Sequence, residues 1–263
     1  MSEATWTTAI TEVKPNQLRL RGYRLDELMG RVSFTEVIHL ALLGELPPPD
    51  KAALLNAILV ASIDHGVTPP SCLAARIIAS TGAPLNAALA GGVLSINRFH
   101  GGAVQGAMEL FQRAVAQGRE AGDAPDQTAA VLVAEYRAAK KRLPGLGHRV
   151  HNQDPRSLKL IALARASGLA GEHLTMALAL ETAAVSALAK RLPLNVDGAI
   201  AALLCDLGIP AGLANAFFIM ARVPGLVAHI IEEQSRMRPM RLVDSREHAY
   251  DGASPRELPP AQS

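Results

Sequence analysis

The sequence is poor in aromatic residues and in cysteine, and its charges nearly cancel. Aromatic side chains make up 3% of the 263 residues, and β-branched residues are few beside the alanines and leucines, which favours helices over strands. The two cysteines, Cys72 and Cys205, lie in apolar helical patterns, which predicts buried free thiols in a reducing compartment, the cytoplasm. The formal net charge of +2 is too small and too dispersed to indicate a nucleic acid or an anionic membrane as a partner.

Signals for secretion and for a membrane span are also lacking. The first residues, Met1 to Trp6, contain no basic segment that leads into an apolar run, so no signal peptide is visible. The longest stretch without charge, residues 77–97, is long enough to cross a membrane, but Pro84, Asn86 and several glycines and serines interrupt it. We therefore expect a buried helical hairpin in an all-α protein of one large domain or two small ones.

Turn and cap signals divide the chain into an N-terminal hairpin and a series of helices. Residues 6–20 are rich in Thr, Val and Ile around Lys14-Pro15-Asn16-Gln17, which predicts a small β-hairpin. Ser33 and Glu36 form a capping box for a helix that Gly44 ends. Further helices are expected at 51–63, 71–80, 84–96, 158–167, 174–188 and 199–207, with a helical connector at 111–141 that a glycine-rich loop at 118–123 interrupts.

The densest polar chemistry follows the turn signal Gly145-Leu146-Gly147. The two glycines allow a backbone that approaches a ligand closely or adopts positive φ. His148 then supplies a side chain that exchanges protons near neutral pH, and Arg156, eight positions later, supplies a fork for a carboxylate. Two interpretations stay open at this point: both side chains face one small acid, or the segment is a surface turn with a solvated charge cluster.

Two other histidines stand at expected helix ends. His65 follows Asp64 at the expected end of the helix at 51–63, with Gly66 as its terminator; the helix dipole there favours an imidazolium that binds an anion. His100, before Gly101-Gly102, can sit in a cleft and donate a hydrogen bond to a developing oxyanion. The alternatives are a purely structural helix end for His65 and a close helix contact for the two glycines.

An aspartate, an arginine and a basic run complete the set of candidates. Asp197, in Asn195-Val196-Asp197-Gly198, enters an apolar segment at a helix start, either as a simple cap or as a catalytic carboxylate. Arg222 lies in an apolar segment where an unpaired charge is hard to bury, so a substrate carboxylate would be a fitting partner. The basic run at 140–142 is either a solvated face or a contact for nucleotide phosphates. His39 reads as a structural residue.

In this order along the chain, the motifs resemble the citrate synthase superfamily, which includes citrate synthases, methylcitrate synthases and the citryl-CoA lyase module of ATP citrate lyase. The resemblance runs from about Leu18 to Arg241, and the short interval between Leu46 and Asp64 is more similar to the lyase module. Three features depart from the synthase pattern: Val104 and residues 67–71 stand where synthases have asparagines, and the interval from His148 to Arg156 is one residue shorter.

The resemblance implies an all-α, citrate synthase-like fold, with a large and a smaller helical domain and a short N-terminal β-hairpin. A single unit would cover residues 1–250, with the smaller helical region at about 149–220 and a disordered tail at 251–263. It implies three catalytic residues: Asp197 as the base at the acyl-CoA α-carbon, His100 as the donor to the enol oxygen and His148 as the acid or base at the hydroxyl carbon. It assigns the carboxylates of the substrate to His65, Arg156, Arg222 and Arg238, and coenzyme A contacts to Gly145, Leu146, Gly147 and Asn195.

The function that follows is that of a citryl-CoA lyase-like enzyme, which cleaves citryl-CoA or a related 3-hydroxy-acyl-CoA to acetyl-CoA and oxaloacetate or another 2-oxo acid. A short citrate or methylcitrate synthase that also hydrolyses the thioester has the same motifs. A third alternative is a non-catalytic, coenzyme A-binding subunit. The resemblance also implies a homodimer whose site receives a late arginine across the interface, Arg238 or its neighbour Arg241. No spacing of metal ligands is present, so we expect no metal.

Overall fold

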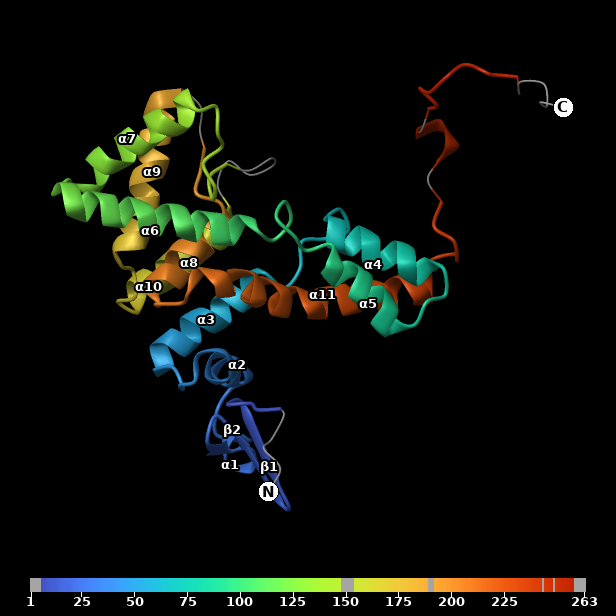
Figure 1. Ribbon diagram of the computed structural model, residues 1–263, viewed down its shortest axis with the longest axis horizontal. Coiled ribbons are helices and arrows are strands. Elements are labelled where there is room, and N and C mark those ends of the chain that lie inside the picture. Colours follow the sequence, from blue (N-terminus) through green and yellow to red (C-terminus); the bar gives the residue numbers. More distant parts are fainter. Residues whose placement is uncertain (1–5, 148–153, 189–191, 243, 248, 258–263) are drawn as a thin grey trace.

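The computed structural model describes residues 6–147, 154–188, 192–242, 244–247 and 249–257. It is predominantly helical, as predicted, and Figure 1 shows an N-terminal sheet unit, a body of packed helices and an arm in which α4 and α5 lie along the second half of α11. In chain order the elements are β1 (Thr11–Lys14), β2 (Gln17–Leu20), β3 (Tyr23–Arg24), α1 (Leu25–Leu28), α2 (Phe34–Leu43), α3 (Pro49–Ala61), α4 (Pro70–Ser80), α5 (Leu85–Leu94), α6 (Ala103–Ala121), α7 (Pro125–Ala138), α8 (Pro155–Ala166), α9 (Glu172–Leu188), α10 (Val196–Asp206), the 3-10 helix η1 (Ala211–Leu213), α11 (Ala214–Arg236) and the 3-10 helix η2 (Ser245–Glu247).

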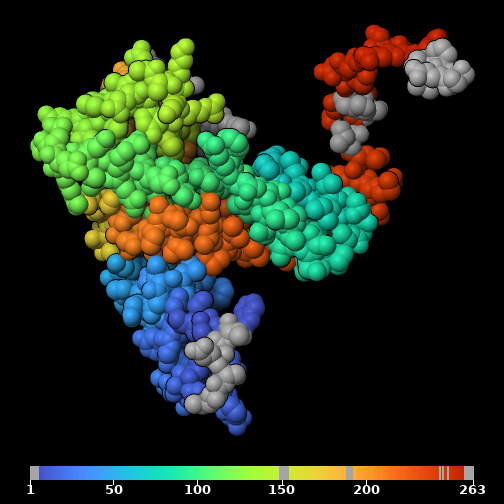
Figure 2. Space-filling view, in the orientation of Figure 1, coloured from blue at the N-terminus to red at the C-terminus, as the bar shows by residue number. Residues whose placement is uncertain are grey.

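The N-terminal sheet is antiparallel, in the order β1-β2-β3. The predicted hairpin is present, with Lys14 opposite Gln17 across the turn and Asn16 at a φ of 58°. It begins at Thr11 rather than at residue 6, and the two-residue strand β3 adds a third strand that is too short to leave a sequence pattern. Figure 2 shows this unit projecting from the helical body, as the segment after α11 also does.

The start of α2 follows the prediction, but the end of α3 does not. Ser33 and Glu36 form the capping box, and Gly44 ends α2 at a φ of 90°. Helix α3 ends at Ala61, and Gly66 (φ 74°) belongs to a separate turn beyond it. His65 is therefore not at a helix C-terminus, and the helix-dipole argument for it was wrong.

The glycine-rich loop predicted at 118–123 is also wrong. Helix α6 continues to Ala121, and Gly122, at a φ of 71°, ends it. Gly118 is a helical residue at the contact with α7, where a Cβ would lie 2.9 Å from Oγ1 of Thr128. A glycine inside a helix thus serves close helix packing here, which a sequence pattern cannot distinguish from a loop.

Two clusters of buried apolar residues organise the helices. The larger one draws on α3, α6–α10 and the start of α11, and the smaller one joins α4 and α5 to Leu226 and Ile230 of α11. Cys72 and Cys205 are buried free thiols, as predicted. Burial raises the pKa of the Cys205 thiol to about 12, which keeps this thiol protonated and inert.

The long helix α11 links the two clusters. Within the described part of the chain, residues 211–236 form the one helix that is long and apolar enough to span a membrane by length and composition. It packs against α3, α4, α5 and α6 and buries Arg222 and Glu233. Glu233 accepts hydrogen bonds from Arg76 (2.6 Å) and Arg241 (2.9 and 2.6 Å), so this helix has the contacts of a core helix.

Candidate active site

A cavity of about 540 Å³ lies where the starts of α6, α8 and α10 face α11 and the segment before α4. Its lining includes seven of the residues that we predicted to act in the site, and these come from segments up to 157 positions apart in the chain (His65 to Arg222). The seven residues are His65, His100, Gly147, Arg156, Asn195, Asp197 and Arg222.

The Gly145-Leu146-Gly147 turn supports one wall of the cavity, which Gly147 lines, and hydrogen bonds join this turn to the start of α10. The Asn195 amide N–H donates to the Gly145 carbonyl (3.1 Å), and the Asn195 side chain donates to the Gly147 carbonyl (2.8 Å). Gly145 and Gly147 have φ values of 80° and 86°, and a Cβ on Gly145 would lie 2.7 Å from Cα of Gly198. Glycine is therefore required here for both backbone conformation and close approach.

Asp197 is the second residue of α10 and faces the cavity. Asn195, not Asp197, caps the helix, because its side-chain oxygen accepts the Gly198 N–H at 2.9 Å. Burial raises the pKa of Asp197, and the positive charges of Arg156 and Arg222 oppose that rise. A carboxyl group whose pKa lies above its ordinary range can exchange a proton closer to neutral pH, as general acid–base catalysis requires.

His100 reaches the cavity from a tight turn just before α6. Its Nε2 lies 2.7 Å from Oγ of Ser71, a fully buried residue of α4. Burial, followed by the charges of Arg222 and His65, lowers the pKa of His100, which favours a neutral imidazole. If Ser71 donates to Nε2, the proton is on Nδ1 and can serve as a hydrogen-bond donor. Ser71 was not among the predicted site residues, because a serine inside an apolar helix carries no signal of its own.

Arg222 is a buried cation, 4% exposed. Its Nε donates to the Ser62 carbonyl at 3.0 Å, and its guanidinium carbon lies 5.0 Å from the ring centroid of Phe218. No carboxylate in the described part of the chain lies within ion-pair distance of it, and burial lowers its pKa. A buried guanidinium without an anionic partner is stabilised by an acid that enters the cavity.

Arg156 reaches the cavity from the first turn of α8. Asp154, which is buried, accepts hydrogen bonds from its Nε (3.1 Å) and Nη2 (2.9 Å). This bidentate pair fixes the plane of the guanidinium and leaves its other edge for a ligand. Asp154 was not among the predicted site residues, and its contact with Arg156 is seen only in the structure.

His65 lies at the rim of the cavity, and the turn before it is anchored to α11. Asp64 accepts the Gly66 N–H at 2.9 Å and faces Nε2 of His229 at 3.1 Å. Burial alone would raise the pKa of Asp64, but the hydrogen bonds from Gly66 and His65 and the charge of His229 lower it overall. Asp64 therefore acts as a carboxylate that holds the turn.

Some predicted residues do not meet the cavity. Arg238 is exposed and does not line it, and Arg241 is occupied within its own chain by Glu233. Gly145 and Leu146 support the wall from behind; Leu146 forms a β-bridge to Leu194. His148 lies outside the described residues, so its role stays a prediction. Over the described ranges, no group of three or more His, Cys, Asp or Glu is placed to hold a metal ion.

The cavity thus combines a half-buried carboxyl group, an imidazole whose lowered pKa favours the neutral form, and two guanidinium groups. Such a set can move a proton at carbon, hold an enolate oxygen and bind carboxylates. Val104, which stands where synthases have an asparagine, is buried in the larger cluster and does not line the cavity.

Comparison with known proteins places this geometry in a family. The family described as "Citrate synthase, C-terminal domain" matches residues 44–242. The structure of citryl-CoA lyase from Hydrogenobacter thermophilus is similar with a TM-score of 0.87 and 41% identity, over 97% of this chain and 98% of that one. ATP citrate lyase from Methanothrix soehngenii, solved with citrate and coenzyme A, gives a TM-score of 0.86 and 26% identity, over 97% of this chain and 43% of that one.

Among curated sequences, "Putative citrate synthase 2" of Mycobacterium bovis is 33% identical over 195 residues, which is 72% of this chain and 49% of that protein. The chain therefore spans about half the length of that curated relative, although it covers nearly all of the solved citryl-CoA lyase. The family match covers most of the chain, and the fold and the motifs agree with it. The chain belongs to the citrate synthase family.

Proposed function

We propose that this protein is a citryl-CoA lyase-like enzyme, which cleaves citryl-CoA or a related 3-hydroxy-acyl-CoA to acetyl-CoA and oxaloacetate or another 2-oxo acid. The observation that carries the proposal is the convergence of Asp197, His100, Arg156 and Arg222 on one cavity. The similarity to a citryl-CoA lyase along nearly the whole of both chains supports it.

The residues supply each step of the cleavage. A base, His148 in our prediction, takes the proton of the substrate hydroxyl, and the hydroxyl carbon becomes the carbonyl of the 2-oxo acid. The electron pair of the broken C–C bond passes to the departing acetyl-CoA enolate, whose oxygen accepts a hydrogen bond from His100. Protonated Asp197 then gives its proton to the enolate carbon, and the raised pKa of Asp197 supports that protonated form.

The remaining predicted residues bind the substrate. Arg156 and Arg222, with His65 at the rim, would hold the carboxylates, because a guanidinium matches a carboxylate in shape and charge. Gly147 and Asn195, which line the cavity, would contact coenzyme A, and Gly145 and Leu146 would support that wall. We also propose a cytoplasmic homodimer; the two buried free thiols support the compartment.

We further propose that Arg238 acts in the partner's site of that homodimer. Its exposed side chain supports this role. Arg241 is the weaker candidate, because Glu233 of the same chain already binds its guanidinium in two places.

Product analysis tests the proposal. Purified protein is incubated with citryl-CoA while free coenzyme A, acetyl-CoA, citrate and oxaloacetate are followed separately. Acetyl-CoA with oxaloacetate is the expected result. Citrate with free coenzyme A would instead support a short synthase, the alternative with the same residues. No turnover, together with coenzyme A binding, would support a non-catalytic coenzyme A-binding subunit.

A matched pair of variants ties the activity to the site. Asp197→Asn and Asp126→Asn both change an aspartate at the second residue of a helix, but Asp126 is exposed on α7. We expect loss of turnover in the first and wild-type turnover in the second. Equal activity of the two variants would show that Asp197 has no catalytic role.

A further inference from the structure

One face of α11 holds residues 62–64, the segment that follows α3. Nε of Arg222 donates to the carbonyl of the first of these residues at 3.0 Å. A Cβ on Gly225 would overlap the carbonyl oxygen of the second. Nε2 of His229 lies 3.1 Å from Oδ1 of the third, Asp64. Positions that are three and four residues apart share a helix face, so the segment runs along α11 for two turns.

His65 comes next, in a turn that Asp64 holds from two directions. Oδ2 of Asp64 accepts the Gly66 N–H at 2.9 Å, and Oδ1 faces His229. One carboxylate thus closes the turn around His65 and joins it to α11. The place of His65 at the rim of the cavity therefore depends on the contact between Asp64 and His229.

The imidazole of His229 is itself oriented by its neighbours. Its Nδ1 lies 3.7 Å from Oε2 of Glu232, one turn further along α11, and Glu232 is paired with Arg236 at 2.7 Å. The His229 side chain is 15% exposed, and it does not line the substrate cavity. Each ring nitrogen thus faces a carboxylate, and an effect of His229 on a bound substrate has to pass through Asp64.

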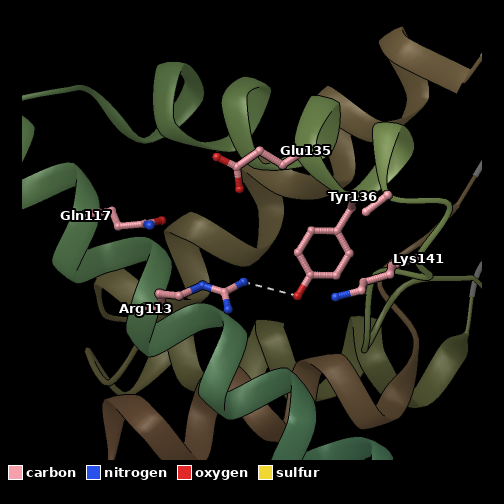
Figure 3. Close-up of a pocket in the computed structure, with 6 residues that line it drawn as sticks. Arg113, Gln117, Glu135, Tyr136 and Lys141 are labelled. Atoms are coloured by element: carbon pink, nitrogen blue, oxygen red, sulfur yellow. Dashed lines mark hydrogen bonds between the residues drawn. The ribbon is translucent and has the colours of Figure 1, made fainter.

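Two other side-chain contacts between helices lack this connection to the cavity. His173 of α9 places Nδ1 2.9 Å from Oδ1 of Asp206 in α10, and its side chain is 17% exposed. Figure 3 shows Arg113 of α6 facing Tyr136 of α7, where Nη2 donates to the hydroxyl at 3.1 Å. Neither these four residues nor their chain neighbours line the substrate cavity, whereas Asp64 directly precedes a residue that does.

We propose that His229 is a positioning residue for the substrate: through Asp64 it holds His65 where a carboxylate of the substrate binds. This inference rests on the proposed function, in which His65 and Arg222 bind carboxylates. Because Arg222 and His229 lie on one face of one helix, α11 sets the distance between the two carboxylate-binding groups before the acid arrives. Groups that are already ordered bind more tightly than groups that must be ordered on binding.

The same geometry predicts which ligand is affected. The residues assigned to coenzyme A, Gly147 and Asn195, are joined to each other by a 2.8 Å hydrogen bond, and neither belongs to α11 or to the segment after α3. Loss of the His229 contact should therefore weaken the binding of the 2-oxo acid and leave the binding of coenzyme A unchanged.

Calorimetric titration with oxaloacetate and with coenzyme A tests this role, after thermal unfolding has verified that each variant is folded. His229→Ala removes the hydrogen bond, whereas His229→Gln keeps an N–H for Asp64. We expect His229→Ala to bind oxaloacetate about tenfold more weakly than the wild type, with unchanged affinity for coenzyme A. His229→Gln should recover much of the lost affinity.

His173→Ala is the matched control, because it also removes a contact between a histidine and an aspartate at similar exposure. It should lower the thermal midpoint and leave both affinities at their wild-type values. A double variant tests the route through Asp64. Asp64→Ala/His229→Ala should bind oxaloacetate no more weakly than Asp64→Ala alone, because both substitutions break the same contact.

Several results would overturn the positioning role. One is wild-type oxaloacetate affinity in His229→Ala, and another is a wild type that binds no oxaloacetate. An equal loss for coenzyme A, or an equal loss in His173→Ala, would indicate a general loosening of the fold. No recovery in His229→Gln, or additive losses in the double variant, would exclude the hydrogen bond to Asp64 as the cause. A wild type whose oxaloacetate affinity depends on His229 but that does not cleave citryl-CoA would refute the proposed reaction and leave the positioning role standing.

Discussion

Gly198 is the point where the site tolerates least change. It is the third residue of α10, and an added Cβ would overlap the carbonyl oxygen of Gly145 and approach Cδ1 of Leu194 to 2.6 Å. The Gly145 carbonyl cannot withdraw without losing its 3.1 Å hydrogen bond from Asn195. We therefore predict that Gly198→Ala destabilises the protein, although alanine is normally the better residue in a helix.

The magnitude follows from two opposed effects. Replacing a helical glycine by alanine stabilises by about 0.5–1 kcal/mol, whereas forcing a methyl group into a filled space costs about 1–3 kcal/mol. The difference between these ranges is a net loss of at most about 2.5 kcal/mol. Because the overlapped atom is a backbone oxygen, we expect a loss of about 1–2 kcal/mol, which lowers the thermal midpoint of a chain of this size by roughly 2–8 °C. Because Asp197 is the preceding residue, a displacement of about 1 Å should also reduce turnover about 10²-fold.

Thermal unfolding and citryl-CoA turnover, the latter measured well below both midpoints, are the assays. Gly106→Ala is the matched control, because Gly106 is also helical and an added Cβ there lies 3.9 Å from Pro144, an ordinary contact. We expect this control to unfold at or slightly above the wild-type temperature. A Gly198→Ala variant with an unchanged or higher midpoint and full turnover would refute the close-approach argument.

Three other predictions concern side chains in or near the site. Asp197→Asn should reduce turnover by about 10²–10⁴-fold and raise the thermal midpoint near neutral pH. Burial raises the pKa of Asp197, so the folded wild type loses stability as the pH rises above the usual range of an aspartate, and the difference between the proteins should vanish in acid. Ser71→Ala should lower kcat about tenfold with little change in KM, because His100 loses one hydrogen bond; an unchanged kcat would contradict that. Glu233→Gln should destabilise by about 3–5 kcal/mol. Hydrogen bonds from Arg241 hold the pKa of Glu233 below its usual range despite burial. The thermal midpoint of the wild type should therefore fall as the pH drops through that range. A midpoint that does not change in acid would contradict a stabilising role for the hydrogen bonds between Glu233 and the two arginines, Arg76 and Arg241.

Local chemistry in the sequence was enough to predict most of the helices, and the resemblance to the citrate synthase superfamily predicted much of the cavity. Ser33 and Glu36 form the predicted cap, and the apolar segments pack as helices. His100 and Asp197, predicted from motifs far apart in the chain, line one cavity. The caps and turns could be predicted because they obey local rules, whereas the meeting of His100 and Asp197 in one site was predicted from the resemblance of their motifs to the family.

The rest depended on tertiary contacts that leave no local pattern. Gly118 looked like a loop residue because close helix packing and a turn both select glycine. Ser71 became visible only once α4 was placed beside His100. The end of α3 was predicted at residue 63, two residues beyond its observed end at Ala61, because the glycine at position 66 also suits the turn that Asp64 organises.

The arrangement of α11 explains why the site depends on the fold and not on any one motif. Phe217 packs in the larger cluster and Leu226 in the smaller one, and Arg222 lies on the same helix between them. Just beyond it, a Cβ on Gly225 would overlap the carbonyl oxygen of Ile63, so the segment that carries His65 is pressed against this helix. One turn of α11 therefore fixes a substrate-binding cation and the rim of the cavity together. Asp197 is fixed separately, by α10 in the larger cluster, so a shift of α11 relative to α10 would move Arg222 and His65 away from Asp197.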